Sequence, residues 1–593
     1  MEMKKFLKYT LAVIVGSFVT IGILMLAFFI MIGIFAASSQ KEISVKDNSV
    51  LVIKLDGPIV ERKISDPISD AIAEILGEPS PIGLNQILSS IKKAQRDDRI
   101  KGIYLESGTV LAGYATVEEI RNALLDFKNS GKFIISYAPV YTQKSYYLAS
   151  VADKVYLSPG GMLEFKGISS HRTFFKNTLE KLGIEMQVFR HGEFKSAVEP
   201  YTRTDMSKPA RMQTLTYTLS IWNHLLSKIN DSRGLSAEKL NVIADQVPMF
   251  KDETFLMQTG LIDGLKYKDQ VINELKDSTN TDYSKDINSI EIKKYADVYV
   301  PDDKKGISKN KIAVIYAEGV IDGTDSSEGI ISEDLSRTIR QARRDTTIKA
   351  VVLRINSPGG SALGSEIIWR EVKLTSETKP LIVSMSDLAA SGGYYIACAA
   401  DTIVAHPNTL TGSIGVFGLI PNVKGLFNKI GITTDRVKTN KYADLPSIDR
   451  PFTSDEKELL QAFVENSYNT FIDRCAEGRN TTKEKIDEIG QGRVWSGKDA
   501  IDINLVDLLG GLDDAIEIAA KNANITDDYR IVELPEELTP FEQFVKSMGG
   551  NVKTRIMSLF WKNNDYAKIL QIINNVENNY PIQARIPYDI SLN

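Results

Sequence analysis

The sequence predicts an α/β protein in which one domain occurs twice, and two observations lead to this prediction. The stretch AQRDDRIKGIYL at 94–105 resembles ARRDTTIKAVVL at 342–353, with six of twelve positions identical. The shift of 248 residues between them persists over about ninety positions, so the similarity indicates a duplication. Within each copy, short β-rich segments alternate with amphipathic helical segments, which is typical of largely parallel sheets.

The elements follow the same order in both copies. The predicted strands are 50–55, 102–105 and 133–137 in the first copy, and 312–316, 350–355 and 381–385 in the second. Apolar residues at helical spacing predict helices at 84–96 and 332–344. Further helices are expected to begin near Tyr146 and near Gly392.

The repeat and the composition divide the chain into five predicted parts. A chain of 593 residues is too long for one core, because cores stop growing near about 250–300 residues. The parts are a cytoplasmic stub with a transmembrane anchor (1–42), the first copy (43–275), a polar linker (276–308), the second copy (309–533) and a C-terminal helical extension (534–593).

The first forty residues predict a membrane anchor. Lys4, Lys5 and Lys8 precede an uncharged, largely apolar run at 9–40, which exceeds the roughly 20 residues needed for a span. The lysines before the run place the N-terminus in the cytoplasm and the remainder outside it. The alternative is a cleaved signal peptide with small residues at 36–38, although its apolar region is usually about 7–15 residues.

The composition argues against several classes of protein. A net charge of −5 is small for this length and gives no indication of nucleic-acid binding. Two cysteines, Cys398 and Cys475, are too few for a disulfide framework or a cysteine-based zinc site. With four histidines in the chain, we also expect no multi-histidine metal centre.

Two glycine-rich turns in the second copy indicate nucleophilic catalysis. The strand at 350–355 runs into a turn with Gly359 and Gly360, whose backbone N–H groups can face a developing oxyanion. The next strand leads to Ser391, which is flanked by small residues and opens a helix at Gly392. By itself this motif is weak, because glycine-rich turns between strands and helices are common.

A nucleophilic serine also needs a base, and the residues alone leave two types open. His406 is one candidate, but it lies at a predicted strand end and its counterpart in the first copy is Ser158, so a structural role is favoured. A lysine can serve instead when burial lowers its pKa from about 10.4 toward neutrality. Composition does not identify which lysine this is.

The duplication shows that the two copies differ at the serine. The counterpart of Ser391 is Gln143, and Gly392 corresponds to Lys144. The first copy therefore lacks both the nucleophile and the glycine turn, so it is either scaffold or contributes another group.

Three features resemble the signal peptide peptidase A family, also called protease IV, in its long tandem form. They are the glycine pair, the segment DLAASGGYY at 387–395 and the run TLTGSIGV at 409–416. The resemblance covers essentially the whole chain. It implies a Clp-protease/crotonase-like fold for each copy and a Ser–Lys dyad, with Ser391 as nucleophile. The general base comes from the first copy in a G-x-x-K-S-A motif, which identifies Lys195 here; its counterpart, Ala443, lacks the amine.

The resemblance also implies the supporting residues and the biology. Ser413 orients the lysine amine, although a plain turn serine is an equal alternative, and Gly359 or Gly360 forms the oxyanion hole with the N–H of Gly392. No metal or other cofactor is needed. The implied substrates are signal-peptide remnants and other short apolar peptides. The enzyme is expected to be a homotetramer, held by a single span in the bacterial cytoplasmic (inner) membrane with its catalytic part facing the periplasm.

Two rival functions remain open from the sequence. A crotonase-type acyl-CoA enzyme shares the oxyanion turns, but such enzymes usually use carboxylates and are commonly soluble. A membrane scaffold without activity is the second rival, because the first copy shows that catalytic residues have been lost within this chain.

Overall fold

The computed structural model describes residues 44–63, 79–106, 108–301, 308–323, 329–526, 528–536 and 582–585, together with residues 9, 13, 15–20 and 22–23. Most of the predicted anchor at 1–42 lies outside the described residues. Among the residues that are described, no helix is both long enough and apolar enough to cross a membrane.

The first copy is built on a parallel sheet of six strands. Apolar residues fill β4, where five of six residues are buried, as expected for a sheet covered on both faces. In spatial order the strands are β8 (Gly264–Leu265), β6 (Lys154–Leu163), β5 (Phe133–Tyr141), β4 (Ile100–Leu105), β1 (Ser49–Ile53) and β9 (Ser289–Glu291).

The second copy repeats this strand order. The path β18-β14-β13-β11-β10-β19 matches β8-β6-β5-β4-β1-β9 strand for strand, which confirms an α/β fold built from two equivalent units. Two further strands extend the sheet beside β13. The strands are β10 (Lys311–Glu318), β11 (Ile348–Ser357), β13 (Leu381–Ala390), β14 (Thr402–Ala405), β15 (Leu410–Gly412), β17 (Val494–Ser496), β18 (Leu508–Leu509) and β19 (Arg530–Leu534).

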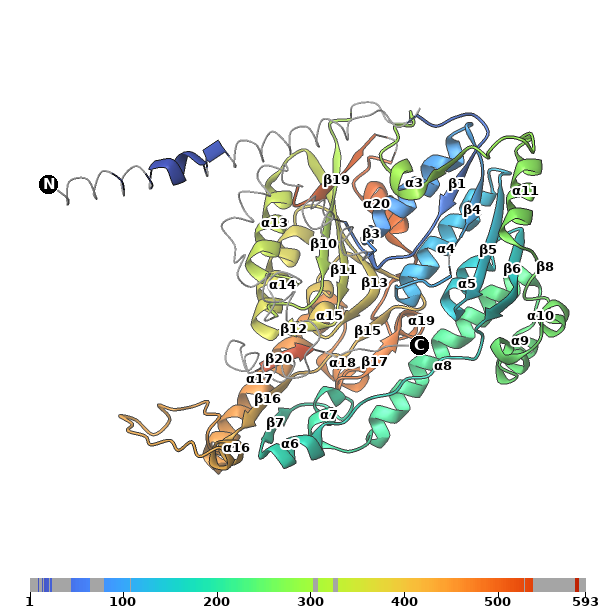
Figure 1. The fold of residues 1–593 in the computed structure, drawn as a ribbon. Coiled ribbons are helices and arrows are strands. Elements are labelled where there is room, and N and C mark those ends of the chain that lie inside the picture. The colour runs from blue at the N-terminus through green and yellow to red at the C-terminus, as the bar shows by residue number, and fades with distance from the viewer. Residues whose placement is uncertain are drawn as a thin grey trace.

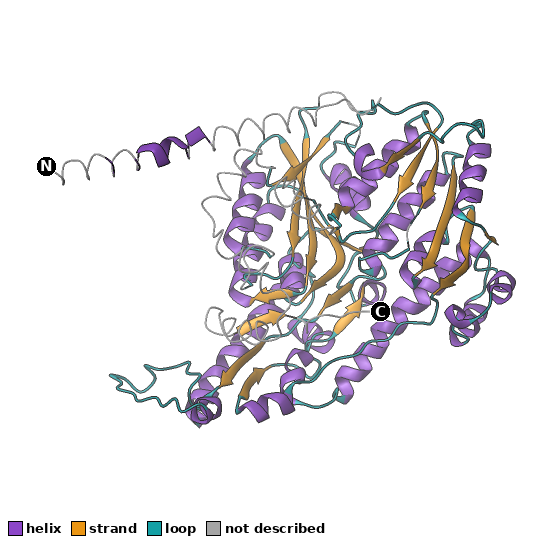
Figure 2. Cartoon of the chain, viewed as in Figure 1, coloured by secondary structure: helices purple, strands orange, loops and turns teal. Residues whose placement is uncertain are grey.

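Helices cover both sheets, which stand side by side in Figures 1 and 2. The predicted helices 84–96 and 332–344 are α3 (Leu84–Arg96) and α13 (Ser332–Arg344). Their buried positions are equivalent: Ile91 and Ala94 in α3 correspond to Ile339 and Ala342 in α13.

Among the described residues, the remaining helices are more numerous in the first copy, which includes several short ones. In the first copy they are α4 (Tyr114–Lys128), α5 (Gln143–Ala149), α6 (Lys176–Leu182), η1 (Ser196–Val198), α7 (Glu199–Thr202), α8 (Lys208–Arg233), α9 (Ala237–Asp245), η2 (Pro248–Phe250), α10 (Glu253–Thr259), α11 (Lys268–Ser278) and α12 (Ile292–Tyr295). In the second copy they are α14 (Ala362–Ser376), α15 (Gly392–Ala397), α16 (Lys424–Lys429), α17 (Ser454–Gly478), α18 (Lys483–Ile489), α19 (Gly497–Asp502) and α20 (Leu512–Asn522).

A third sheet, which is antiparallel, joins the two copies. Strand β7 (Glu185–Arg190) of the first copy pairs along its whole length with β16 (Phe417–Asn422) of the second. The opposite edge of β16 meets β20 (Ile582–Arg585), which also pairs with β12 (Gly359–Ser361). A small parallel pair, β2 (Ile59–Val60) and β3 (Ile82–Gly83), lies in the first copy.

Two segments differ from the sequence-based description. Residues 289–291, inside the predicted linker 276–308, form β9 and pair with β1, so this part of the segment belongs to the first sheet. Three residues with one buried side chain give too short an apolar pattern to predict a strand. Within 534–593, predicted as a helical extension, residues 582–585 form a strand, and residues 537–581 lie outside the described part.

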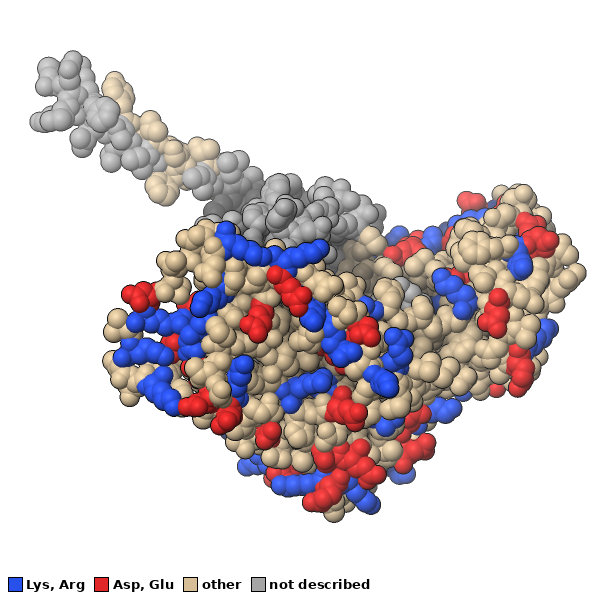
Figure 3. Space-filling model, turned by 90° about the horizontal axis from the view of Figure 1, so that it is seen from below, with Lys and Arg blue, Asp and Glu red and all other residues tan. Residues whose placement is uncertain are grey.

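Apolar packing crosses the boundary between the copies. Each copy has its own large buried cluster, but the cluster of the first copy also includes Ala390, Leu410 and Val494 of the second. On the face shown in Figure 3, acidic and basic side chains are interspersed.

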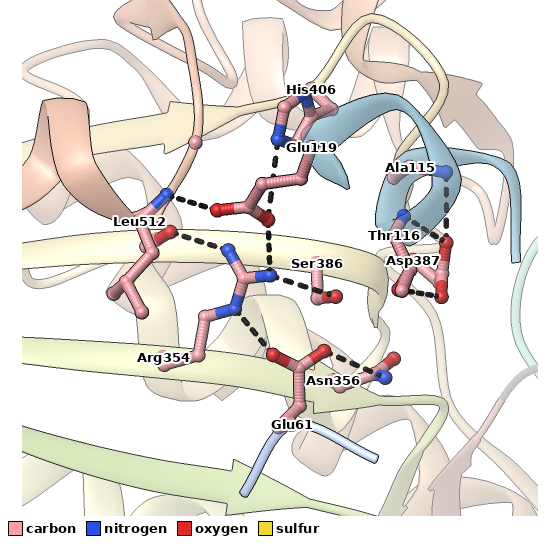
Figure 4. Close-up of polar contacts among 12 residues, drawn as sticks. Glu61, Ala115, Thr116, Glu119, Arg354, Asn356, Ser386, Asp387, His406 and Leu512 are labelled. Atoms are coloured by element: carbon pink, nitrogen blue, oxygen red, sulfur yellow. Dashed lines mark hydrogen bonds and ion pairs between the residues drawn. The ribbon is translucent and has the colours of Figure 1, made fainter. Parts of the chain in front are cut away.

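A buried charge network also connects the copies (Figure 4). Arg354 on β11 is fully buried, and its guanidinium donates to two carboxylates of the first copy: Nε to Glu61 at 2.7 Å and Nη2 to Glu119 at 2.6 Å. It also donates to Ser384 and Ser386 on β13, at 2.8 and 3.1 Å. Because a buried charge is tolerated only when it is paired, this arrangement fixes how the two copies dock.

Neighbouring contacts extend the network toward the ends of β11 and β13. Asp387 accepts hydrogen bonds from the N–H groups of Ala115 and Thr116 at the start of α4, at 2.9 and 3.0 Å, where a helix favours negative charge. Asn356, at the end of β11, donates to Glu61 at 3.1 Å. Residues of the first copy therefore fix the ends of β11 and β13, which lead to the glycine turn and to Ser391.

Replacing Arg354 by alanine tests this docking. We expect the variant to lose about 3–5 kcal/mol of stability, because Glu61 and Glu119 remain buried without their partner. Urea unfolding followed by tryptophan fluorescence measures the change. As the control, Arg337→Ala removes an exposed pair with Asp334 and should cost less than about 1 kcal/mol; equal losses in both variants would contradict the role given to Arg354.

Candidate active site

Ser391 lies in the turn between β13 and α15. Its backbone has φ 56° and ψ −114°, a conformation that residues with a side chain rarely adopt. The turn is held by hydrogen bonds from Ser391 N to the Gly412 carbonyl and from Tyr395 N to the Ser391 carbonyl, both at 2.8 Å. The local sequence therefore forms the predicted strand–turn–helix unit, with the serine at its strained centre.

Lys195 reaches this serine from the first copy. It lies between β7 and η1, and its Nζ is 2.7 Å from Ser391 Oγ. Nζ also donates to the carbonyl oxygen of Ser413 at 3.1 Å and lies 3.1 Å from Ser413 Oγ. The three residues proposed from the sequence as nucleophile, base and orienting group are thus in direct contact.

Burial controls the charge of this lysine. The Lys195 side chain is only 1% exposed, and desolvation alone lowers its pKa well below the ordinary value. Glycines allow the close enclosure: a Cβ at Gly492 would lie 2.6 Å from Lys195 Cβ, and one at Gly415 would lie 3.2 Å from its Cδ. The amine is therefore poised to be neutral at a pH where an exposed lysine is charged.

Ser413 has a fixed position in this arrangement. Its φ of 50° is again in the left-handed region, and its N–H donates to the Arg493 carbonyl at 2.7 Å. Its Oγ donates to the Gly492 carbonyl at 3.3 Å, so its lone pairs face the lysine amine. This geometry suits an orienting group better than a plain turn serine.

The glycine pair lies in β12, beside the serine turn. Ile321 N donates to the Gly359 carbonyl at 3.0 Å, and Ser361 N donates to the Ile321 carbonyl at 2.9 Å. Because successive N–H groups of a strand point to opposite sides, the Gly360 N–H points away from Ile321 and toward β20, where Gly360 lies opposite Ala584. The Gly359 N–H is already bonded to Ser357 Oγ at 3.1 Å. Each glycine N–H therefore faces a partner within the chain, Ser357 Oγ for Gly359 and strand β20 for Gly360.

Gly392 supplies a second N–H in the same region. As the first residue of α15, its N–H has no carbonyl partner within the helix. The helix start is packed tightly against the end of β11, since a Cβ at Gly393 would lie 2.7 Å from the Ser357 carbonyl oxygen. This close approach explains why the second residue after the serine is also a glycine.

The equivalent position in the first copy has no comparable chemistry. Gln143 Oε1 accepts hydrogen bonds from the N–H groups of Lys166 and Gly167 at 3.1 and 3.0 Å, and its Nε2 donates to Tyr114 at 3.2 Å. Ala443, the counterpart of Lys195, is exposed in a loop before α17. The two copies therefore hold one serine–lysine pair between them at these equivalent positions.

His406, the other candidate base, belongs to a different cluster. Its Nε2 lies 3.4 Å from Glu119 Oε2, in the charge network between the copies. Burial disfavours its charged form, but the contact with Glu119 outweighs burial and raises the pKa of His406. The structure thus places this histidine with the carboxylates and not with Ser391.

Several residues that shape the site have no signal in the sequence motifs. Gly415 and Gly492 enclose the lysine, and Gln213 on α8 contacts the loop that carries it. Gly415 lies within the TGSIG run and could have been considered, whereas Gly492 and Gln213 approach only through the tertiary fold. A strained serine beside a buried amine, with the Gly392 N–H at the adjoining helix start, can perform acyl transfer.

Comparisons with known proteins agree with this chemistry. The family model described as peptidase family S49 matches residues 126–282 and 373–526, one region in each copy. The chain is 36% identical to "Serine protease SPPA, chloroplastic" of Arabidopsis thaliana over 509 residues, covering 84% of this chain and 74% of the relative. It is 33% identical to "Protease 4" of Haemophilus influenzae over 516 residues, covering 85% and 84%.

Among solved structures, a ClpP1 mutant from Listeria monocytogenes aligns with 34% of this chain and 94% of its own, at 16% identity. The TM-score of that alignment is 0.24, which supports no conclusion about the fold.

Replacing Lys195 by methionine tests its dehydrated state. Since the unfolded chain binds a proton at a pKa near 10.4 and the folded lysine has a lower pKa, wild-type stability should rise with pH between these two values. In the methionine variant no proton has to be lost from a buried amine on folding. We therefore expect this variant to melt at a higher temperature than wild type at pH 7, with the difference shrinking toward pH 10. Thermal melting across this range measures it, with the exposed Lys349→Met as control; a pH-independent difference would exclude a neutral Lys195.

Proposed function

The chain belongs to peptidase family S49 and is a serine peptidase, and on that premise we propose that Ser391 is its nucleophile and Lys195 its general base. The observation that carries this proposal is the 2.7 Å contact between Lys195 Nζ and Ser391 Oγ. A lysine whose pKa is lowered by burial in a dehydrated site is suited to accept a proton.

Acylation follows from this contact. Neutral Lys195 removes the proton of Ser391 Oγ while Oγ attacks the carbonyl carbon of the scissile peptide bond. The resulting lysine ammonium then gives its proton to the leaving amine as the C–N bond breaks. The acyl group remains as an ester on Ser391, and Lys195 is neutral again.

Deacylation uses the same residues. Lys195 takes a proton from a water molecule, and the oxygen of that water attacks the ester carbonyl. The tetrahedral intermediate collapses, the protonated lysine returns its proton to Ser391 Oγ, and the carboxylic acid product leaves. In both steps Ser413 keeps the amine directed at the serine, supported by its 3.1 Å contact with Nζ.

The oxyanion hole combines the N–H of Gly392 with that of Gly359 or Gly360. Both glycines lie in the glycine turn that follows β11, and the helix start supports Gly392 as donor. Preorganised N–H groups of this kind stabilise charge that develops only in the transition state. Gly359 supports the turn through its φ of 97°.

The division of labour between the copies is part of the proposal. Residues 43–275 supply the base and residues 309–533 supply the nucleophile and oxyanion hole. Residues 276–308 connect the copies, and 534–593 extend the second. In this reading the first copy is a catalytic partner of the second.

The cellular role follows from the N-terminal sequence and the relatives. The apolar run at 9–40 supports a single-span anchor in a bacterial cytoplasmic membrane, with the catalytic part outside the cytoplasm. An enzyme in that position is suited to cleave signal-peptide remnants and other short apolar peptides. The proposed assembly is a homotetramer. Membrane sedimentation of the full chain, compared with a chain starting at residue 43, tests the anchor.

The dyad is tested with the full-length chain in detergent and a fluorogenic apolar peptide. We expect Ser391→Ala and Lys195→Ala each to lose about 10³-fold or more in kcat/KM, because each removes a group that acts on the reacting atoms. Gln143→Ala, at the equivalent serine position of the first copy, should keep wild-type activity. Wild-type turnover by Lys195→Ala would mean that the base lies elsewhere.

The oxyanion donor is tested at Gly360. A Cβ at this position would lie 2.1 Å from the Ile321 carbonyl oxygen, so Gly360→Ala must shift the strand and its N–H. We expect kcat to fall about 10²–10³-fold, the usual cost of one oxyanion donor. Labelling of Ser391 by a fluorophosphonate, detected by mass spectrometry, should slow in parallel; unchanged kcat would exclude Gly360 as donor.

A further inference from the structure

Gln213 connects the lysine loop of the first copy to the second copy. It lies on α8 and is 3% exposed. Its Nε2 donates to the Phe194 carbonyl at 2.9 Å and to Ser196 Oγ at 3.2 Å, on either side of Lys195. Its Oε1 accepts a hydrogen bond from Val494 N at 3.1 Å. One buried amide thus contacts both copies beside the site.

The second-copy end of this bridge is the segment that holds Ser413. Val494 follows Gly492 and Arg493, whose carbonyl oxygens accept the hydrogen bonds from Ser413 Oγ and Ser413 N. The same segment encloses the lysine, because Gly492 packs against Lys195. Gln213 therefore ties the backbone that carries the amine to the backbone that orients it.

The bridge uses the amide in one orientation only. Both hydrogen-bonding ends are occupied by groups of fixed character, since Phe194 offers a carbonyl and Val494 offers an N–H. A carboxylate, an apolar side chain or a reversed amide cannot reproduce this pattern. Each would leave a buried backbone group without its partner, which the surrounding chain can relieve only by moving.

We propose that Gln213 is a positioning residue that holds Lys195 in register with Ser413 and Ser391. The proposal rests on the proposed function of the dyad and deepens it, because Gln213 touches none of the reacting atoms. It sets the position of the amine and keeps its surroundings dry, so it affects both the geometry of proton transfer and the protonation of Lys195.

The test compares three variants of the full-length chain. Gln213→Met keeps the length and volume of the side chain but removes the hydrogen bonds. Gln213→Glu keeps the shape and places a carboxylate beside the lysine loop. The matched control is Gln461→Met on α17, which removes an exposed hydrogen bond from Gln461 Nε2 to the Arg190 carbonyl at the end of β7. Peptide hydrolysis is measured from pH 5 to 10, with the melting temperature of each variant.

Gln213→Met should lower kcat about 10–100-fold with little change in KM, because a small displacement of a catalytic group is costly. Its activity should rise at higher pH than in wild type, since water reaching a loosened lysine raises its pKa. Gln213→Glu should shift the rise in activity to a still higher pH, because a nearby carboxylate favours the protonated form of Lys195. Gln461→Met should retain the wild-type profile.

Two outcomes overturn the proposal. The first is a wild-type kcat and pH profile in Gln213→Met. The second is a lower melting temperature with an unmoved pH profile in both Gln213 variants, because a merely structural residue would behave in this way. Failure of the dyad is distinguishable, since Ser391→Ala or Lys195→Ala would then keep activity whatever Gln213 does.

Discussion

The docking of the two copies depends on the buried contact between Arg354 of the second copy and two carboxylates of the first, Glu61 and Glu119. Glu61 directly follows β2 and Glu119 lies on α4, so a single guanidinium fixes both segments of the first copy against β11. Because none of these groups can be left buried alone, alternative dockings of the two copies are strongly disfavoured. The serine turn and the lysine loop can then be built in different copies and still meet within hydrogen-bonding distance.

The site also requires that water be excluded from the Lys195 amine, and closely packed glycines make this possible. Backbone at Gly415 and Gly492 packs closely against the Lys195 side chain, and burial accounts for its lowered pKa. A carboxylate in the same place would hold the amine protonated. The charged residues of the interface instead gather around Arg354 and His406, so the network that fixes the docking is kept apart from the dyad.

Much of this could be predicted from the sequence, because the repeat supplies its own alignment. The helices 84–96 and 332–344 and the positions of the main strands follow from local patterns compared across the two copies. The pair Ser391 and Lys195 comes from the family resemblance, and the repeat supports it because each copy lacks the group that the other holds. Membership of family S49 agrees with the resemblance in the motifs and excludes the acyl-CoA alternative. Residues such as Glu61 and Gln213 could not be predicted, because each has a partner in the other copy hundreds of positions away and no periodicity marks them. Strand β9 was missed because only one of its three residues is buried.

The order of the two copies along the chain has a consequence for biosynthesis. The ribosome releases the lysine-bearing half first, so under the proposed mechanism a nascent chain or a terminated product that ends before residue 391 holds the base without the nucleophile. Proteolytic potential then arises only when the completed halves have docked. Splitting the dyad in this way couples the onset of cleavage to the completion of folding, and it protects the cell from a peptidase that is still being made.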